Sequence, residues 1–272
     1  MAVITISRQV AALGDEIASD LAKKIGYTFI DRKQIEKRIV ELGFPKEKLE
    51  KYDERKPGFF ASLAKDRDEY LNYLQYAVLE AASSGNCILI GRGAFIILDE
   101  LPNLVAMRFV ANDNVRLERL KNEFSWEDKQ AQARIDESDN NRRGFHKSFF
   151  NADHENPSRY LFTLNTGLLG REDSVKIIEG VVKSYITPQK EAAGKEKVAM
   201  LLKGQRLVNQ LLFDFKMNIN FLRAVVEKDV ITLQGVADSH ALVDRAVQAA
   251  AKILPTCEIR SAITISRDYK AF

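Results

Sequence analysis

The first thirty residues constrain the fold more than any other part of the chain. A β-branched run at 3–6 predicts a short buried strand. After a turn, apolar residues recur four apart on one face of an expected amphipathic helix over 14–25: Ile17, Leu21 and Ile25. Residues 27–30 then predict a second strand. A strand, a helix and a strand at this spacing predict a βαβ unit, and therefore a parallel sheet covered by helices.

The same alternation continues to about residue 185. The expected elements are, in order, a largely helical stretch over 33–84 with a break at 53–58, strands at 87–91 and 104–110, a charged helix over 112–143, a strand at 160–165 and a helix over 172–185. The run at 87–91 is apolar or glycine throughout, which is typical of a central strand that is buried on both faces. The sequence therefore predicts an α/β domain with a five-stranded parallel sheet flanked by helices.

A second, smaller domain is expected after residue 197. The polar stretch at 187–195 predicts a break between domains, where few contacts should cross. Beyond it we expect a helix over 201–215, strands at 222–226 and 230–234, a helix over 239–253 and a strand at 259–266. The order αββαβ predicts a small α+β domain. We place the two domains at 1–187 and 198–272.

Composition narrows the classes of function. The net charge is +3, from 41 basic and 38 acidic residues, a balance that argues against a general nucleic-acid binder. Cys87 and Cys257 lie in different expected domains, so no disulfide framework is predicted. The three histidines lack the spacing of metal ligands, so we expect no metal site of their making, and His146 is expected to face solvent. No secretion signal or membrane span is recognised, and we expect a cytoplasmic protein.

The turn after the first strand is where phosphate-binding loops lie, because backbone N–H groups and the helix dipole favour an anion there. Such loops usually contain several glycines, a lysine and a Ser or Thr. Here Gly14 remains, with Asp15 at the lysine position and Glu16 at the hydroxyl position. Ala11, Ala12 and Leu13 are expected to resist the positive φ angles that wrap a phosphate. Arg8 is a candidate to replace the lysine, and an ordinary βα turn stays an open alternative.

Several short motifs occur in a fixed order along the first 185 residues. They are Ile4-Thr5-Ile6-Ser7-Arg8-Gln9, Glu16-Ile17, Leu21-Ala22, Gly26-Tyr27, Phe29, Asp31-Arg32, Ile90-Gly91-Arg92-Gly93-Ala94, the set Asp139, Arg142 and Phe145, and Leu164-Asn165-Thr166. In order and spacing they resemble the cytidylate kinase-like family, a branch of the P-loop nucleoside monophosphate kinases. The resemblance implies transfer of the γ-phosphoryl group of ATP to CMP or a related monophosphate, with Mg²⁺. At the corresponding place the family has Gly-Ser-Gly-Gly followed by Arg. This chain has Ala11-Ala12-Leu13-Gly14 there, followed by Asp15. We therefore expect phosphoryl transfer to be very weak or absent, and leave open whether the chain is an enzyme.

The resemblance also assigns roles to individual residues. The degenerate phosphate loop would use Arg8, Gly14, Asp15 and Glu16. The acceptor nucleotide would be bound by Asp31, Arg32, Arg92 and Asp139, and Arg142 and Arg143 would act from a lid. The alternatives are an ion pair at Arg92, a helix cap at 31–32 and a solvated charge run at 142–143.

The C-terminal part resembles the BON domain family over about 200–268. The resemblance rests on 230–236, Val-Ile-Thr-Leu-Gln-Gly-Val, and on a helix with Ala246, Ala249, Ala250 and Ile253. It implies binding of lipids or other small ligands, or association, which leaves a homo-oligomer open. A domain that only stabilises or dimerises the first is the alternative. A second hypothesis for the whole chain is therefore a non-catalytic ligand sensor or scaffold, in which an inactive kinase fold reports occupancy to this domain.

Overall fold

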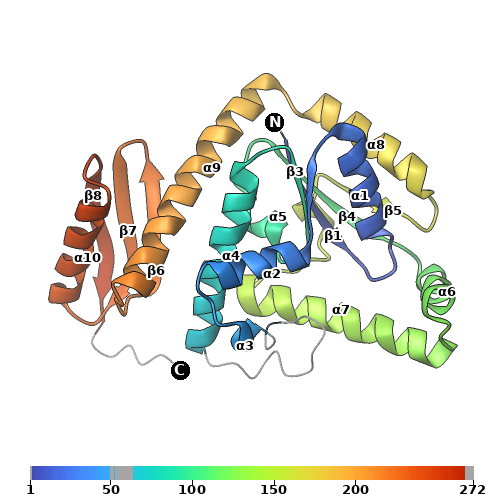
Figure 1. Ribbon diagram of the computed structural model, residues 1–272, viewed down its shortest axis with the longest axis horizontal. Coiled ribbons are helices and arrows are strands. Elements are labelled where there is room, and N and C mark those ends of the chain that lie inside the picture. The colour runs from blue at the N-terminus through green and yellow to red at the C-terminus, as the bar shows by residue number, and fades with distance from the viewer. Residues whose placement is uncertain (1, 50–51, 53–63, 267–272) are drawn as a thin grey trace.

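The computed structural model describes residues 2–49, 52 and 64–266 of the protein. Its larger sheet has five strands in the order β2-β3-β1-β4-β5, and all neighbouring strands are parallel. The strands are β1 (Val3–Arg8), β2 (Thr28–Ile30), β3 (Cys87–Ile90), β4 (Leu104–Val110) and β5 (Phe162–Asn165). The prediction of a five-stranded parallel sheet is confirmed. Because β1 is the central strand, the loop that follows it lies in the middle of the row of strand carboxyl ends (Figure 1).

Helices pack on both faces of this sheet. In chain order they are α1 (Gly14–Ile25), α2 (Arg32–Glu41), α3 (Lys46–Leu49), α4 (Ala64–Ser83), α5 (Ala94–Ile97), α6 (Asp113–Phe124), α7 (Asp128–Phe150) and α8 (Arg171–Tyr185). Alternate residues of β3 enter two separate cores: Ile88 and Ile90 pack with α1 and α8, whereas Cys87 and Leu89 pack with α4 and α7. β3 is thus covered on both faces, as its apolar run predicts.

The helical segments at 33–84 and 112–143 were expected to contain one break and none, respectively. The expected break at 53–58 lies outside the described residues. The single helix expected over 112–143 is instead two helices, because Ser125 adopts a left-handed conformation that ends α6, and Glu127 with Gln130 forms a capping box that starts α7. Periodicity within the charged stretch did not reveal this corner.

The polar stretch at 187–195 is helical rather than irregular. The Thr187 hydroxyl accepts a hydrogen bond from the Lys190 N–H at 3.3 Å and Pro188 occupies the first turn, so α9 begins here and runs without interruption as Pro188–Asn209. Thr-Pro is a strong helix start signal, which polar composition had obscured. A π-helical turn, Gln210–Asp214, follows. The division into domains 1–187 and 198–272 stays a prediction.

A second small sheet follows α9. Its strands are β6 (Asn220–Glu227), β7 (Val230–Ala237) and β8 (Glu258–Ile265), in the order β6-β7-β8, with α10 (His240–Ile253) before the last strand. The β6–β7 pair is antiparallel and the β7–β8 pair is parallel. The expected αββαβ order is therefore present.

The helix α9 links the two sheets along its length (Figure 1). Near its start Gly194 lies directly against Asn103 of the larger unit. Further along, the Gln205 amide donates to the Asn72 side chain of α4 at 3.0 Å, and Gly204 lies against the backbone of β6. Within the described ranges, no helix combines the length and the apolar character needed to cross a bilayer.

Candidate functional site

The loop between β1 and α1 has two residues in the left-handed backbone region. Ala11 and Leu13 have φ angles of 58° and 55°, so the expectation that these side chains keep the loop out of the left-handed region is wrong. The first α-helical hydrogen bond of α1 runs from the Ile17 N–H to the Leu13 carbonyl, at 3.0 Å. The N–H groups of residues 14–16 precede that bond, and no side chain described in the structure caps this end at Leu13. The geometry therefore leaves the start of α1 suited to an anion.

Three side chains hold this strained loop through its carbonyl oxygens. Arg116 Nε donates to the Val10 carbonyl at 3.0 Å, Arg119 Nη1 to that of Ala11 at 2.9 Å, and the Thr166 hydroxyl to that of Ala12 at 3.0 Å. Arg116 and Arg119 come from α6, and Thr166 follows β5. Because consecutive carbonyls are engaged from these elements, tertiary contacts offset the cost of positive φ in residues that carry a Cβ.

Arg116 depends in turn on Asp139, a residue assigned above to the acceptor nucleotide. The Arg116 side chain is 1% exposed, and its Nη2 lies 2.8 and 2.9 Å from the two Asp139 oxygens. Asp139 therefore neutralises the arginine that supports the loop. The sequence does not indicate that Arg116 and Arg119 support the loop. Both lie in a charged helix, where arginines are expected to be exposed to solvent.

Arg8 lies across the mouth of the loop. A Cβ added to Gly14 would lie 2.7 Å from Arg8 Cγ, and one added to Gly91 would lie 2.7 Å from Arg8 Nη1. Gly14 thus leaves room for the stem of Arg8, whereas the end of that side chain lies over Gly91 in the turn after β3. Its Nε is 3.7 Å from the exposed carboxylate of Asp15, while Glu16 is exposed beside it. The structure brings Arg8, Gly14 and Asp15 together.

Arg92 is buried and engaged within the fold. Its side chain is 1% exposed, its Nη1 donates to the Tyr52 carbonyl at 2.8 Å, and its Nη2 pairs with Glu36 of α2. The guanidinium also lies 5.6 Å from the centre of the Phe145 ring. Of the alternatives open from sequence, an ion pair at Arg92 describes this geometry, although the pair is internal and not at the surface.

The neighbouring acceptor residues act at the start of α2. The Asp31 carboxylate accepts from the Gln34 N–H at 2.8 Å, and the Gln34 side chain accepts from the Asp31 N–H at the same distance. This is a capping box, which agrees with the alternative of a helix cap at 31–32 that the sequence left open. Arg32 lies 3.5 Å from Glu36, so two arginines converge on that carboxylate.

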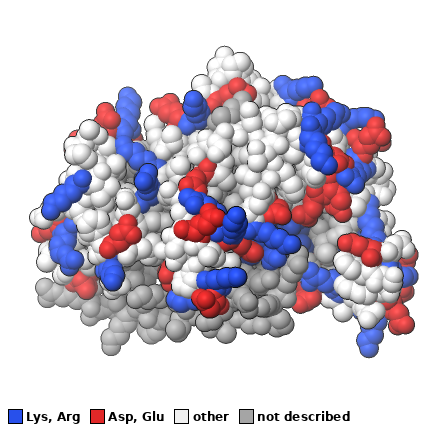
Figure 2. Space-filling view, in the orientation of Figure 1, with Lys and Arg blue, Asp and Glu red and all other residues white. Residues whose placement is uncertain are grey.

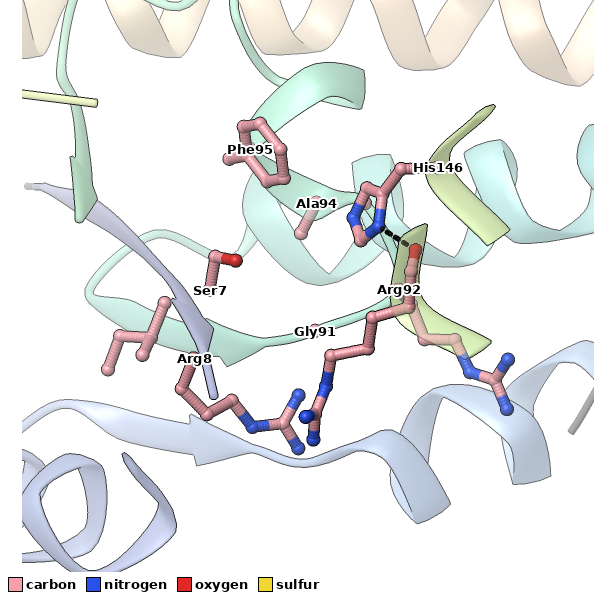
Figure 3. Close-up of a pocket in the computed structure, with 10 residues that line it drawn as sticks. Ser7, Arg8, Gly91, Arg92, Ala94, Phe95 and His146 are labelled. Carbon is pink, nitrogen blue, oxygen red and sulfur yellow. Dashed lines mark hydrogen bonds between the residues drawn. The ribbon is translucent and has the colours of Figure 1, made fainter. Parts of the chain in front are cut away.

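The two lid arginines lie on α7 but point to different surroundings. Arg142 Nη1 donates to the Ser138 hydroxyl at 2.6 Å and is 4.0 Å from Asp139. Arg143 is 3.4 Å from Glu155. A cavity of about 10 Å³, with room for about one water molecule, is lined by Arg8, Arg92 and Arg142 together with Ser7 and His146 (Figure 3). Arg143 does not line it.

Two histidines form a buried stack beside this cavity. The His146 and His154 rings lie 4.6 Å apart and nearly parallel, and both side chains are buried, so the expectation that His146 faces solvent is wrong. Burial, followed by the nearby His146 and Arg108, lowers the pKa of His154 to about 3. The ring is therefore neutral at physiological pH, because a second cation beside these arginines would be costly.

The acidic residues bear on whether Mg²⁺ could act here. The described part of the chain contains no group of three His, Cys, Asp or Glu side chains that could hold a metal ion. Mg²⁺ commonly binds through one or two carboxylates together with phosphate oxygens. Asp15 and Glu16, exposed at the start of α1, suit an ion that arrives with a nucleotide rather than one held by protein alone.

Comparison with known proteins shows the family and the fold. Residues 3–168 match the model of the cytidylate kinase-like family. An uncharacterized protein from Eubacterium ventriosum has a similar structure, with a TM-score of 0.55, 16% identity and coverage of 67% of this chain and 98% of that one. No curated protein matches the chain.

Two further solved structures have lower TM-scores. Shikimate kinase from Bacteroides thetaiotaomicron has 17% identity, a TM-score of 0.42 and coverage of 67% and 98% of the two chains. A gluconokinase from Sinorhizobium meliloti has 14% identity, a TM-score of 0.40 and coverage of 67% and 92%.

Proposed function

Because the chain belongs to the cytidylate kinase-like family, we propose that it binds a nucleotide, or another small phosphorylated ligand, at the loop between β1 and α1. The observation that carries the proposal is the left-handed conformation of Ala11 and Leu13, held by contacts from α6 and the end of β5. With this backbone, N–H groups at the start of α1 and the Arg8 guanidinium form an anion site without the usual glycines and lysine.

The reaction that such a site would serve is transfer of the γ-phosphoryl group of ATP to CMP or a related monophosphate, with Mg²⁺. We propose that it is very slow. Unit charges about 4 Å apart interact by about 4 kcal/mol at a surface-like dielectric, so an aspartate in the lysine position costs several kcal/mol before Arg8 offsets it. The acceptor side is also weakened, because a monophosphate would compete with Glu36 for Arg92.

Steady-state turnover of ATP with CMP, dCMP and UMP tests this assignment. We expect less than about 1 turnover per second, below the range typical of kinases. The variant Asp15→Lys should tighten ATP binding by at least about tenfold, because it replaces repulsion by attraction. Glu227→Lys, which reverses an exposed carboxylate at the end of β6 in the second sheet, is the control and should leave ATP affinity unchanged. Rapid turnover would refute the slow reaction, and equal effects of the two variants would refute binding at this loop.

A non-catalytic sensor or scaffold is the second candidate function. The supporting observation is that the site is already neutralised internally, through Arg92 with Glu36 and Arg116 with Asp139. A ligand at the loop would be reported through α4 and α9, which contact each other, and α9 in turn contacts β6 of the second sheet. Hydrogen exchange along α9 with and without ATP or CMP would test it: binding without turnover, and with altered exchange in α9, is the expected result. The BON-like character of the second unit, its binding of lipids and self-association stay proposals, as does the cytoplasmic location.

A further inference from the structure

A second cleft lies away from the phosphate loop, between α4, α9 and the end of α10. Its volume is about 540 Å³, within the range of sites for small molecules. It is lined by Tyr76 of α4, by Lys203 and Arg206 of α9, and by Leu254 beyond α10, among others. It shares no lining residue with the small cavity near Arg8 and Arg92. Its ligand would therefore be distinct from the nucleotide proposed above.

The cleft carries positive charge that carboxylates do not neutralise. Lys203 and Arg206 are three residues apart, on one face of α9. Lys203 Nζ donates to the Cys257 sulfur at 3.0 Å, and Arg206 is exposed. Across the part of the chain that the structure describes, neither cation has an ion pair. In contrast, Arg92 and Arg116 of the first site both have carboxylate partners.

The remaining walls are mainly apolar. The apolar lining comes from Leu202 and Leu207 of α9 and from Ile253 and Leu254 at the end of α10, and Ala199 lies one turn before the cations. Ser83 and Gln210 add a small number of polar groups. A few polar or charged groups in an apolar cleft is the usual composition of a ligand site, where the charged groups fix the orientation of the ligand.

We propose that this cleft binds a small organic anion with an apolar body. Its phosphate or carboxylate group would lie on Lys203 and Arg206, and its apolar part against the leucines of α9 and α10. The two cations favour an anion over a neutral or cationic molecule of the same shape. Because the lining comes from α4 as well as the end of α10, the bound ligand would contact both the larger unit and the helix that packs on the second sheet. The proposal does not rest on the proposed nucleotide site.

Calorimetric titration of the full chain with octyl phosphate, below its micelle concentration, tests the proposal. We expect one equivalent to bind, and inorganic phosphate, octanol and octyltrimethylammonium each to bind at least about tenfold more weakly, because each lacks one element of the match. Binding should also raise the melting temperature, since the ligand binds only the folded chain. Equal binding of the cationic and anionic octyl compounds would overturn the proposal.

Four variants locate the site. Lys203→Gln and Arg206→Gln should each weaken octyl phosphate binding by about tenfold, in line with the loss of a charged contact. Arg223→Gln removes the same charge from β6, outside the cleft, and should leave affinity unchanged. Ala199→Trp, at an exposed lining position, should abolish binding by filling the cleft, with the fold checked by circular dichroism. Equal effects of Arg206→Gln and Arg223→Gln, or unaltered binding by the tryptophan variant, would overturn the assignment.

A fifth variant separates this cleft from the phosphate loop. Arg8→Gln removes the cation at the mouth of that loop and should leave octyl phosphate affinity unchanged. Loss of binding in Arg8→Gln, with normal binding in Arg206→Gln, would place the probe at the phosphate loop and refute a site at this cleft. Failure of the ATP experiments, with the octyl phosphate results as expected, would refute only the nucleotide proposal.

Discussion

Replacing Ala11 with glycine should stabilise the protein, although it removes a methyl group. Ala11 has a φ of 58°, and a left-handed conformation costs an L-residue about 1–2 kcal/mol, which glycine does not pay. Two losses oppose this gain. Glycine loses about 0.5–1 kcal/mol more backbone entropy on folding than alanine. Removal of the methyl group loses roughly half of the 0.8 kcal/mol that burial of a methyl group contributes, because Ala11 is only partly buried. The expected net effect is a gain of about 0.5 kcal/mol in the free energy of unfolding.

The adjacent Ala12 provides a matched control, because the chemical change is identical and the backbone is not. Ala12 is 1% exposed and is absent from the residues with positive φ. Ala12→Gly should therefore lose the methyl burial and the backbone entropy with no relief of strain, a cost of about 1.5 kcal/mol. The two neighbouring substitutions should differ by about 2 kcal/mol and have opposite signs.

Urea unfolding followed by tryptophan fluorescence measures both variants. Trp126 is the single tryptophan of the chain and packs in the same small cluster as Ala11, so its signal reports on this region. The midpoint should rise for Ala11→Gly and fall for Ala12→Gly, with an unchanged denaturant slope. Equal destabilisation by both would show that the loop is not strained at Ala11, and would remove the physical basis for a phosphate-loop backbone held by Arg116, Arg119 and Thr166.

Three further predictions concern other parts of the structure. Arg92→Ala should reduce the free energy of unfolding by about 3 kcal/mol, because Glu36 loses its buried partner. Arg32→Ala should reduce it by less, because Arg32 lies farther from Glu36, and equal losses from the two variants in urea unfolding would contradict this account. The pKa of His154 is about 3 in the folded chain and about 6.5 in the unfolded chain, so the unfolded chain binds more protons between pH 3 and 6.5. The free energy of unfolding should therefore fall by up to about 1.4 kcal/mol for each unit that the pH is lowered within this range. His154→Phe should flatten this pH dependence when unfolding is measured in acid, and an unchanged slope would contradict a role for His154. Limited trypsin digestion should spare Lys190, Lys195 and Lys197 in the native protein because they lie in α9, and a first cleavage at any of them, seen by mass spectrometry, would contradict a continuous helix.

The candidate site was predicted only in part. The loop after β1 and the meeting of Arg8, Gly14 and Asp15 follow from the position of a turn at the carboxyl end of a strand. The loop conformation was not predicted, because alanine and leucine ordinarily avoid positive φ and only contacts from α6 and Thr166 overrule that preference. Arg119 and Ala11 lie 108 positions apart, and Arg92 and Glu36 lie 56 apart, so no local pattern connects them.

By itself the sequence determined the elements whose cause is local. The apolar runs of β1 and β3 and the four-residue spacing in α1 specify strands and a helix wherever the chain places them, because the periods of 2 and 3.6 residues are properties of the backbone. The tertiary structure decided which charges are available for chemistry. Arg92 and Asp139 read from sequence as groups that meet a ligand, yet each is engaged by another part of the fold, Arg92 by Glu36 and Asp139 by Arg116. The reason is that a buried charge is tolerated only with a partner, and the partner is supplied by packing between distant segments rather than by neighbours in the chain.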